Sequence, residues 1–107
     1  MTFYFHPEAD EEFFHAVEYY ENRDFGLGID FSREIQAAIQ NIIDYPKMWP
    51  KIDDEVHRYL CHRFPYGILY SIETDCIFIL AVMHLYRDPD YWKHRLGRIG
   101  STRLTDD

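Results

Sequence analysis

The feature that most constrains the fold is a near-continuous apolar run at residues 77–82, inside a longer stretch at residues 76–96. Charged and polar residues bound this run, and a short apolar run with such boundaries is typical of a strand buried on both faces. After the run the chain becomes polar, aromatic and basic. We expect a rigid strand to hold this segment at one end of a sheet, where its side chains either serve a function or cap the core.

Upstream, the spacing of apolar residues predicts a short aromatic strand at residues 2–6 and then two helices. The first helix should span residues 7–24, because proline suits the first turn of a helix and apolar residues then recur at three- and four-residue spacing. Its acidic residues are interpreted as a solvated face. A break with two glycines at residues 25–28 leads into a second helix, which starts at residue 27 or 29 and ends at residue 44. The apolar positions of the first helix are Ala9, Phe13, Ala16, Val17 and Tyr20.

From residue 56 onward the pattern changes from helical to alternating. Strands are predicted at residues 56–62 and 68–73, and a two-residue link at 74–75 is short enough for a hairpin into the strand at 77–82. Asp88 followed by Pro89 ends that strand and can begin a short helix. The packing face of that helix would be formed by Tyr91, Trp92 and Leu96.

These elements predict an α+β fold in a single domain at residues 1–96. It consists of an N-terminal strand, a two-helix hairpin packed on an antiparallel sheet of about four strands, and a short C-terminal helix. The first strand is expected beside the apolar last strand, and the helices should cover one face of the sheet, leaving the other as the working surface. Trp49 is expected to cover an edge of the core. Residues 97–107 lack periodicity and are expected to form a flexible tail.

Several functional classes are excluded by composition. No run approaches the ~20 apolar residues of a membrane span, and no basic-then-apolar signal opens the chain, so we expect a cytoplasmic protein without a membrane partner. Cys61 and Cys76 are interpreted as free, buried thiols. The sequence has no nucleophile elbow, phosphate loop, dinucleotide fingerprint or zinc-ligand spacing, and it predicts neither a cofactor nor a metal.

The net charge of −8 is distributed unevenly. Residues 1–55 carry 13 acidic and 4 basic residues, whereas residues 56–107 carry 6 acidic and 7 basic ones. A polyanion should therefore meet the second half of the chain. Long-range repulsion by the acidic half nonetheless opposes tight binding of nucleic acid.

The second half contains basic and aromatic residues that suit a phosphate-containing ligand. The forked N–H donors of arginine match the geometry of phosphate, and aromatic rings stack on bases. His, Tyr and Arg can supply the proton acceptor, the proton donor and the cation that RNA cleavage needs without a metal. The alternative is structural: the arginines pair with surface acids, and the aromatic residues seal the open end of the sheet. The residues concerned are Arg58, Arg63, His84, Arg87, Tyr91, Trp92 and Arg95.

Several stretches together resemble the RelE/ParE superfamily, the toxins of type II toxin–antitoxin modules, which are also labelled plasmid-stabilisation proteins. The resemblance spans about residues 3–96 and is closest to the ParE-like branch. It rests on the order and spacing of residues 6–9, 19–20, 26–28, 46–50, 63–66, 81–84 and 87–92, together with Phe31, Tyr70 and Arg95.

The resemblance implies a bacterial toxin that inhibits growth and is neutralised by a cognate antitoxin protein. ParE-like members inhibit DNA gyrase, whereas RelE-like members cleave messenger RNA in the ribosome. The positions that match the family are Arg63, Arg87 and Tyr91, with Arg58 and His84 as additions. In a nuclease the catalytic residues would be Arg63, Arg87, Tyr91 and His84. In a binding toxin the target or antitoxin surface would be Arg58, Arg63, Arg87, Tyr91, Trp92 and Arg95.

This chain departs from RelE-like nucleases in its charge. It has three lysines, Lys47, Lys51 and Lys93, none on a predicted strand, and it is acidic overall. The first hypothesis is therefore a toxin that inhibits DNA gyrase by binding. The second is a metal-independent, ribosome-dependent mRNA endoribonuclease, and the third is a non-toxic, degenerate family member that acts as a binding scaffold. The acidic outer face of the helical hairpin predicts a basic antitoxin segment.

Overall fold

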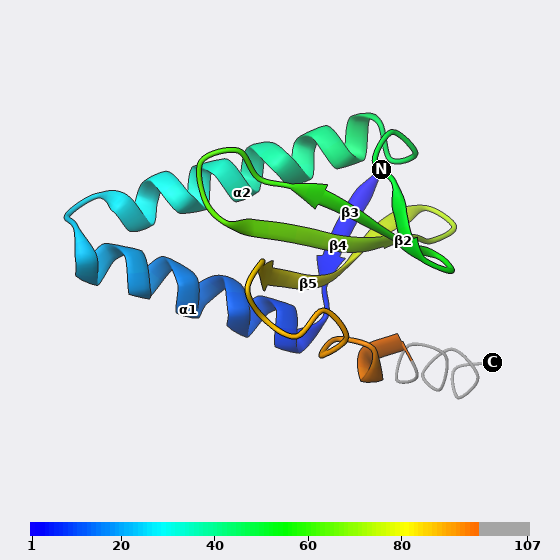
Figure 1. The fold of residues 1–107 in the computed structure, drawn as a ribbon. Coiled ribbons are helices and arrows are strands. Elements are labelled where there is room, and N and C mark those ends of the chain that lie inside the picture. The colour runs from blue at the N-terminus through cyan, green and yellow to red at the C-terminus, as the bar shows by residue number, and fades with distance from the viewer. Residues whose placement is uncertain (97–107) are drawn as a thin grey trace.

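The computed structural model describes residues 1–96 and is shown in Figure 1. The expected flexible tail, residues 97–107, lies outside the described residues. None of the helices in the described part of the chain is long and apolar enough to cross a membrane. The elements are β1 (Thr2–Phe5), α1 (Pro7–Arg23), α2 (Leu27–Asp44), β2 (Lys51–Asp53), β3 (Val56–Leu60), β4 (Tyr66–Ile72) and β5 (Cys76–His84).

The strands form one sheet in the order β1-β5-β4-β3-β2. β1 runs parallel to β5, and the other neighbours are antiparallel. The predicted place of the first strand beside the last strand is therefore confirmed. β5 has a strand on each side and is buried from residue 77 to residue 83, as its apolar run predicts.

The sheet has one strand more than predicted. β2 is three residues long and pairs at the sheet edge with β3, where Lys51 lies opposite His57. A strand this short offers no alternating pattern to detect, so its pairing depends on the position of β3 and not on a local signal. β4 also begins at Tyr66, two residues before the predicted start.

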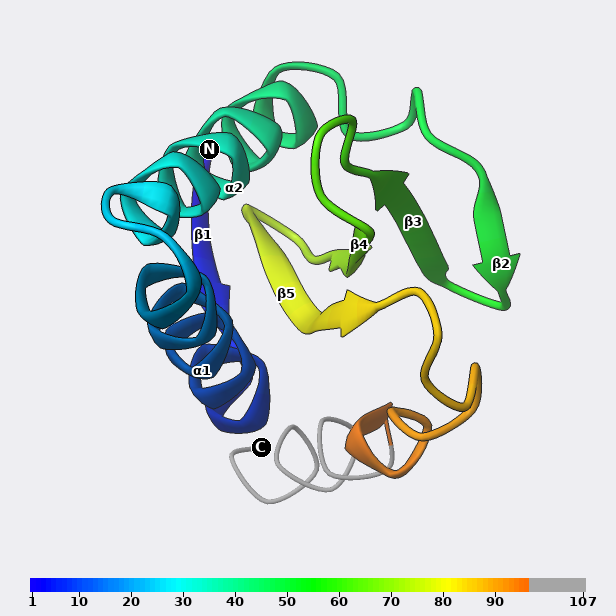
Figure 2. The same cartoon turned by 60° about the vertical axis from the view of Figure 1, so that its left-hand side comes forward.

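The two helices form a hairpin that covers one face of the sheet, as Figure 2 shows. The predicted apolar stripe of α1 and the apolar residues of α2 point into the core between these layers, together with alternate residues of β4 and β5. This arrangement confirms the predicted α+β fold. The residues buried in this core include Ala9, Ala16, Phe31, Ile35, Ile42, Ile68, Tyr70, Ile77 and Ile79.

Two glycines shape the tight link between α1 and α2. Gly26 has φ 83°, in the left-handed region that favours glycine. The Glu21 carboxylate accepts from the amides of Gly26 at 2.9 Å and Gly28 at 3.0 Å. A Cβ at Gly28 would lie 2.5 Å from the Val17 carbonyl oxygen, so the close approach of the helices requires glycine there.

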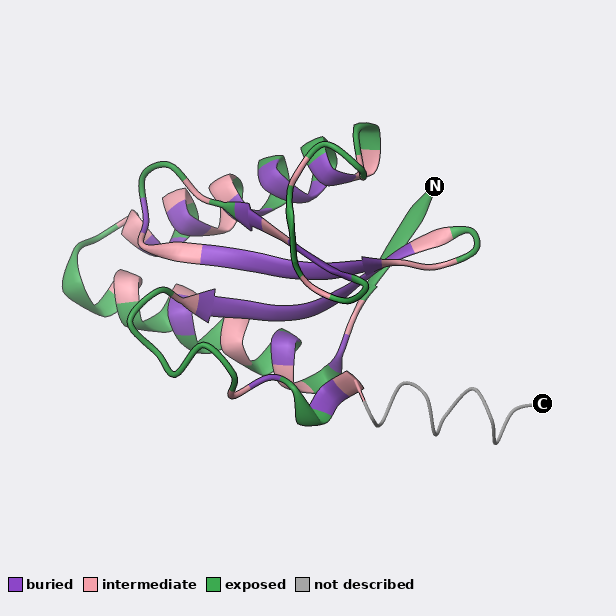
Figure 3. Ribbon diagram, turned by 45° about the vertical axis from the view of Figure 1, so that its right-hand side comes forward, coloured by how far each residue is buried: buried purple, intermediate pink, exposed green. Residues whose placement is uncertain are grey.

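The chain after β5 covers part of the opposite face of the sheet. Asp88 accepts from the Asp90 amide at 2.9 Å, but this bond starts a run of turns and not the predicted helix, whose helical residues begin only at His94. Figure 3 shows buried positions in this short segment below β5. The predicted working surface is therefore smaller than expected, because the C-terminal segment covers part of the sheet face opposite the helices. The second core formed here contains Val56, Leu69, Phe78, Leu80, Ala81, Met83 and Trp92.

The connection from α2 to β2 folds over the core edge. The Trp49 ring packs against the Tyr59 ring with centroids 4.8 Å apart and is half-buried, so its predicted covering role is confirmed. Cys61 and Cys76 are free thiols of intermediate burial.

Candidate functional site

Among residues 1–96, the second half of β5 has no strand partner on one edge. β1 pairs with β5 from Cys76 to Ile79 and then leaves the sheet, where the His6 amide donates to the Ile79 carbonyl at 2.9 Å. The register with β4 also shifts here, which makes Leu80 an extra residue. Buried backbone groups beyond Ile79 must therefore find side-chain partners.

Glu12 of α1 and Arg95 of the C-terminal segment supply these partners. Glu12 Oε1 accepts from the Val82 amide at 3.1 Å and from Arg95 Nη1 at 3.0 Å. Arg95 Nη1 also donates to the Leu80 carbonyl at 2.8 Å. The side chains of Glu12 and Arg95 are 12% and 4% exposed. The unpaired edge of β5 is therefore capped by one largely buried ion pair.

The second carboxylate oxygen of Glu12 binds three more groups. Oε2 accepts from Arg95 Nη2 at 3.1 Å, from Arg87 Nη1 at 3.2 Å, and from the Tyr91 hydroxyl in a short hydrogen bond. The Arg87 guanidinium lies 3.7 Å from the centroid of the Tyr91 ring. We call Glu12, Arg87, Tyr91 and Arg95 the Glu12 cluster.

Electrostatics fix the protonation of two members of the Glu12 cluster. Burial, and then the hydrogen bond and charge of Glu12, raise the pKa of the Tyr91 hydroxyl. For Arg95, burial favours the neutral form, but the hydrogen bond and charge of Glu12 outweigh it and raise the pKa. Tyr91 is therefore held as a protonated donor and Arg95 as a cation.

Glu8, one helical turn before Glu12, extends this network. His94 Nε2 lies 2.9 Å from Glu8 Oε2, and Arg95 Nε lies 3.7 Å from the same oxygen. Arg95 thus meets both carboxylates and Arg87 meets Glu12, so ion pairs attach the C-terminal segment to α1.

The interpretation of the α1 acids as a solvated face is wrong for Glu12. This residue lies three positions after Ala9 and four before Ala16, both of which are buried. Helical spacing therefore places Glu12 on the apolar stripe. A carboxylate in that position needs a buried partner, and this was the sequence signal that could have revealed the cluster.

A hollow of about 360 Å³ lies beside the Glu12 cluster, between α1 and the end of β5. The His84 ring lies edge-on to the Tyr66 ring at 5.1 Å, and His84 Nδ1 accepts from the Tyr86 amide at 3.1 Å. Burial and then neighbouring charges, chiefly that of Tyr20, raise the pKa of Tyr66 to about 12. Sequence reasoning missed several of the residues lining the hollow, because they come from other elements. The lining includes Glu12, His15, Tyr19, Tyr66, His84 and Arg87.

The structure places the other two predicted arginines apart from this cluster. Arg63 is exposed and forms an ion pair with Asp30 at 3.1 Å, in the loop before β4. Arg58 projects from the sheet face away from the helices, beside Gly67. Its Nε is buried and has no hydrogen-bond partner among residues 1–96. The arginines therefore form separate features of the surface and not one continuous patch.

Trp92 and Arg95 are buried, whereas the other predicted site residues are at least partly exposed. The Trp92 indole donates to the Pro89 carbonyl at 2.6 Å within the C-terminal segment, and its ring packs among buried residues of β3, β4 and β5, which holds the segment on the sheet. Within the described chain, no three His, Cys, Asp or Glu side chains are placed to hold one metal ion.

The arrangement of a helical hairpin on this sheet defines a known class of fold. A solved structure, "Chromosomal ParDE TA system from P. aeruginosa", shares it with a TM-score of 0.58. The alignment covers 79% of this chain and 96% of that chain at 12% sequence identity, so the likeness shows the fold. The comparison with curated proteins found no match.

The family described as "ParE toxin of type II toxin-antitoxin system, parDE" matches residues 3–89. The chain belongs to this family, and the resemblance to type II toxins stated from the sequence is confirmed. The matched region contains Arg58, Arg63, His84 and Arg87 but ends before Tyr91.

Proposed function

We propose that this toxin arrests bacterial growth by binding DNA gyrase, without cleaving RNA, and that a cognate antitoxin neutralises it. Family membership supports the toxin role. One observation favours binding over cleavage: Oε2 of the Glu12 carboxylate accepts hydrogen bonds from Arg87, Tyr91 and Arg95.

Cleavage of RNA by its own 2′-hydroxyl needs a proton acceptor, a proton donor and a cation for the developing phosphorane charge. In the Glu12 cluster the charges of Arg87 and Arg95 are offset by carboxylates. Tyr91 already donates to Glu12, and its raised pKa makes it a weak acid that stays protonated near neutral pH, so no tyrosinate is available to accept a proton. A phosphate that approaches the cluster would also meet the Glu12 charge, so the cluster is better suited to holding the C-terminal segment than to catalysis.

The hollow beside the cluster supports a second candidate function, the ribosome-dependent mRNA endoribonuclease. His84 and Arg87 both line it, and His15 faces them from α1. Arg87 is 51% exposed and is therefore the cluster member best placed to contact an external phosphate. In this alternative His84 transfers the proton and Arg87 binds the phosphate.

The outer face of the helical hairpin suits the antitoxin. Exposed acidic and exposed apolar side chains lie together there. A partner segment with basic residues for the acids and apolar residues for the apolar side chains would complement this face. A bound segment rich in acidic residues would contradict this assignment. The exposed acids are Asp10, Glu11 and Glu18, and the exposed apolar residues are Phe14 and Ile29, with Asp24 and Phe25 exposed in the link between the helices.

Growth assays test the toxin role. Induced expression of the chain in bacteria should arrest growth, and co-expression of the antitoxin encoded beside it should restore growth. Arg63→Ala should weaken the arrest, because Arg63 is exposed on the proposed target surface, whereas Arg33→Ala on the outer face of α2 should not. Normal growth with the wild-type chain alone would favour the non-toxic scaffold.

Nucleic acids from the arrested cells separate binding from cleavage. We expect relaxed plasmid DNA, as gyrase inhibition produces, and no new 5′ ends when messenger RNA is analysed by primer extension. New 5′ ends with normal supercoiling would instead establish the endoribonuclease and exclude the gyrase target.

A further inference from the structure

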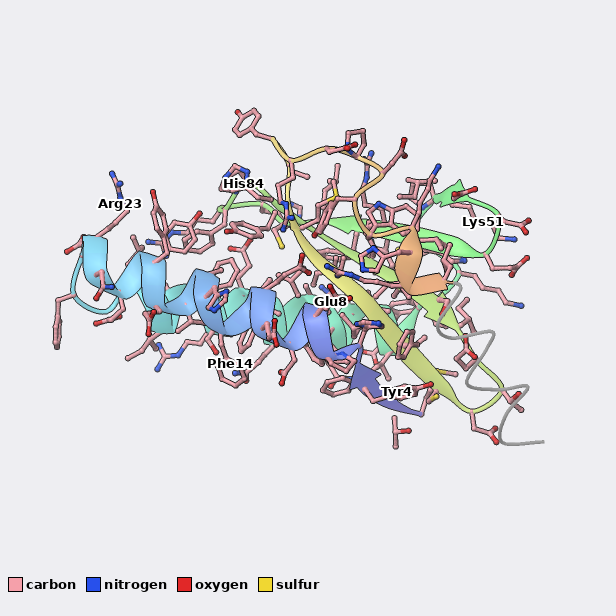
Figure 4. The ribbon with its side chains drawn as sticks, turned by 90° about the horizontal axis from the view of Figure 1, so that it is seen from below. Tyr4, Glu8, Phe14, Arg23, Lys51 and His84 are labelled. Atoms are coloured by element: carbon pink, nitrogen blue, oxygen red, sulfur yellow. The ribbon has the colours of Figure 1, made fainter. Side chains whose placement is uncertain are left out.

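A second cavity, of about 650 Å³, shares no lining residue with the Glu12 cluster and lies where the α2–β2 connection meets β3 and the end of β4. Figure 4 shows Lys51, on its rim, at the opposite end of the molecule from Arg23. Ligand sites usually measure about 300–1,000 Å³, so this cavity has the size of one. Its lining includes Lys47, Met48, Trp49, Lys51, His57 and Ile72.

A buried histidine in the cavity wall has one ring nitrogen with no hydrogen-bond partner among residues 1–96. His57 is 6% exposed, and its ring stacks on Tyr70 with 15° between the planes. His57 Nδ1 lies 2.7 Å from the Trp49 carbonyl oxygen. A carbonyl only accepts, so Nδ1 carries the proton and Nε2 of the neutral ring is an acceptor. No hydrogen bond joins Nε2 to a residue of the described chain, which leaves it for a ligand.

The cavity also gathers positive charge in an acidic protein. Two of the three lysines in the chain, Lys47 and Lys51, line it. Lys51 Nζ lies 3.7 Å from a Glu55 carboxylate oxygen in an exposed pair, which is a weak interaction. Lys47 is exposed and forms no ion pair with any residue in the described range. A ligand anion would therefore meet two ammonium groups and one carboxylate.

We propose that this cavity binds a phosphomonoester that carries an apolar group, with a nucleoside monophosphate as the model compound. A phosphomonoester has a charge of about −1.5 to −2 near neutral pH, which matches two ammonium groups. Lysine binds phosphate as a point charge, and His57 Nε2 accepts a hydrogen bond from a ligand hydroxyl. Met48 and Trp49 supply apolar surface beside them. The proposal is independent of the toxin function.

The test is an NMR titration of the isotopically labelled full-length chain with AMP at neutral pH. We expect saturable shifts of the His57 ring and the Met48 methyl group, with the Tyr91 ring unchanged. Adenosine and inorganic phosphate should each bind at least about tenfold more weakly than AMP, because each lacks one half of the recognised group.

Variants of exposed lysines keep the test independent of folding. Lys47→Ala and Lys51→Ala should each weaken AMP binding by about tenfold at an unchanged melting temperature. Lys93→Ala, at a lysine outside the cavity, is the matched control and should bind as the wild type does. Absence of a saturable shift at His57, or equal affinities of the Lys47→Ala and Lys93→Ala variants, would overturn the site. Tighter binding of benzoate than of AMP would overturn the ligand class.

Discussion

Replacing Glu12 by glutamine should strongly destabilise the fold. Glu12→Gln keeps the shape of the side chain but removes the charge that faces Arg95, whose side chain is 4% exposed. The side-chain carbonyl oxygen of glutamine can still accept some of these hydrogen bonds. Its NH₂ group, however, would face the N–H groups of Arg87 or Arg95, which also donate. The buried Arg95 guanidinium would then keep only the more distant Glu8 carboxylate, which lies 3.7 Å from Nε, as a counter-ion.

The size of the effect follows from the burial of the pair. Removing one partner of a buried ion pair costs about 3–5 kcal/mol, because the other charge stays buried without compensation. The residual exposure of Glu12 and the acceptor that glutamine keeps place the expected loss near the lower end, at about 3 kcal/mol of unfolding free energy. For a domain of this size that corresponds to a fall in melting temperature of roughly 12–24 °C.

Urea unfolding followed by circular dichroism measures this loss. Glu11→Gln is the matched control, because Glu11 is the exposed neighbour on the same helix and should change stability by less than about 0.5 kcal/mol. Adding Arg95→Met to Glu12→Gln should recover part of the loss, since it removes the buried charge that has lost its main partner. Equal stability of the Glu12→Gln and Glu11→Gln variants would refute the buried-pair reasoning.

Three further predictions concern other parts of the molecule. Gly28→Ala should cost about 1–3 kcal/mol, because the added Cβ would lie 2.5 Å from a backbone oxygen of α1, whereas Gly67→Ala meets its nearest neighbours at 3.5 Å and should be tolerated. Equal melting temperatures of these two variants would contradict the packing argument. Burial and then the charge of Glu34 raise the pKa of the Cys61 thiol from 9.0 to about 12, which lowers its thiolate fraction by a factor on the order of 10³. Alkylation of Cys61 at pH 8, read by mass spectrometry, should be far slower in the native chain than in urea, and equal rates would count against the burial. Burial is also the main cause that raises the pKa of Tyr66 and Tyr70 from 10.0 to about 12, so their protonated forms favour the folded state. The resulting stability is complete below pH 10 and is lost as pH rises from there through 12, so the urea midpoint should be lower at pH 11 than at pH 9, and an unchanged midpoint would oppose this.

The elements with strong periodicity could be predicted from the sequence. The apolar run at residues 77–82 required a strand with neighbours on both sides, and β5 has them. The helical stripes and the glycine break likewise fixed α1 and α2, because apolar spacing decides which face is buried. β2 was not predicted, because three residues at a sheet edge are too few to show an alternating apolar pattern.

The candidate site was harder to predict because it depends on contacts between distant segments. Arg87, Tyr91 and Arg95 stood out by residue type, yet their shared partner Glu12 lies more than 70 residues away in the chain. Spacing could place Glu12 on the buried stripe, but it could not identify which cation the carboxylate meets. The register shift at Leu80, which exposes the backbone groups that need capping, also has no signature in residue type.

The most direct measurement of the proposed function is a supercoiling assay with purified gyrase, relaxed plasmid DNA and ATP. We expect the purified chain to inhibit supercoiling in proportion to its concentration, and an equimolar amount of the antitoxin to restore it. Full supercoiling activity in a molar excess of the chain, accompanied by cleavage of messenger RNA on added ribosomes, would contradict a toxin that acts on gyrase by binding.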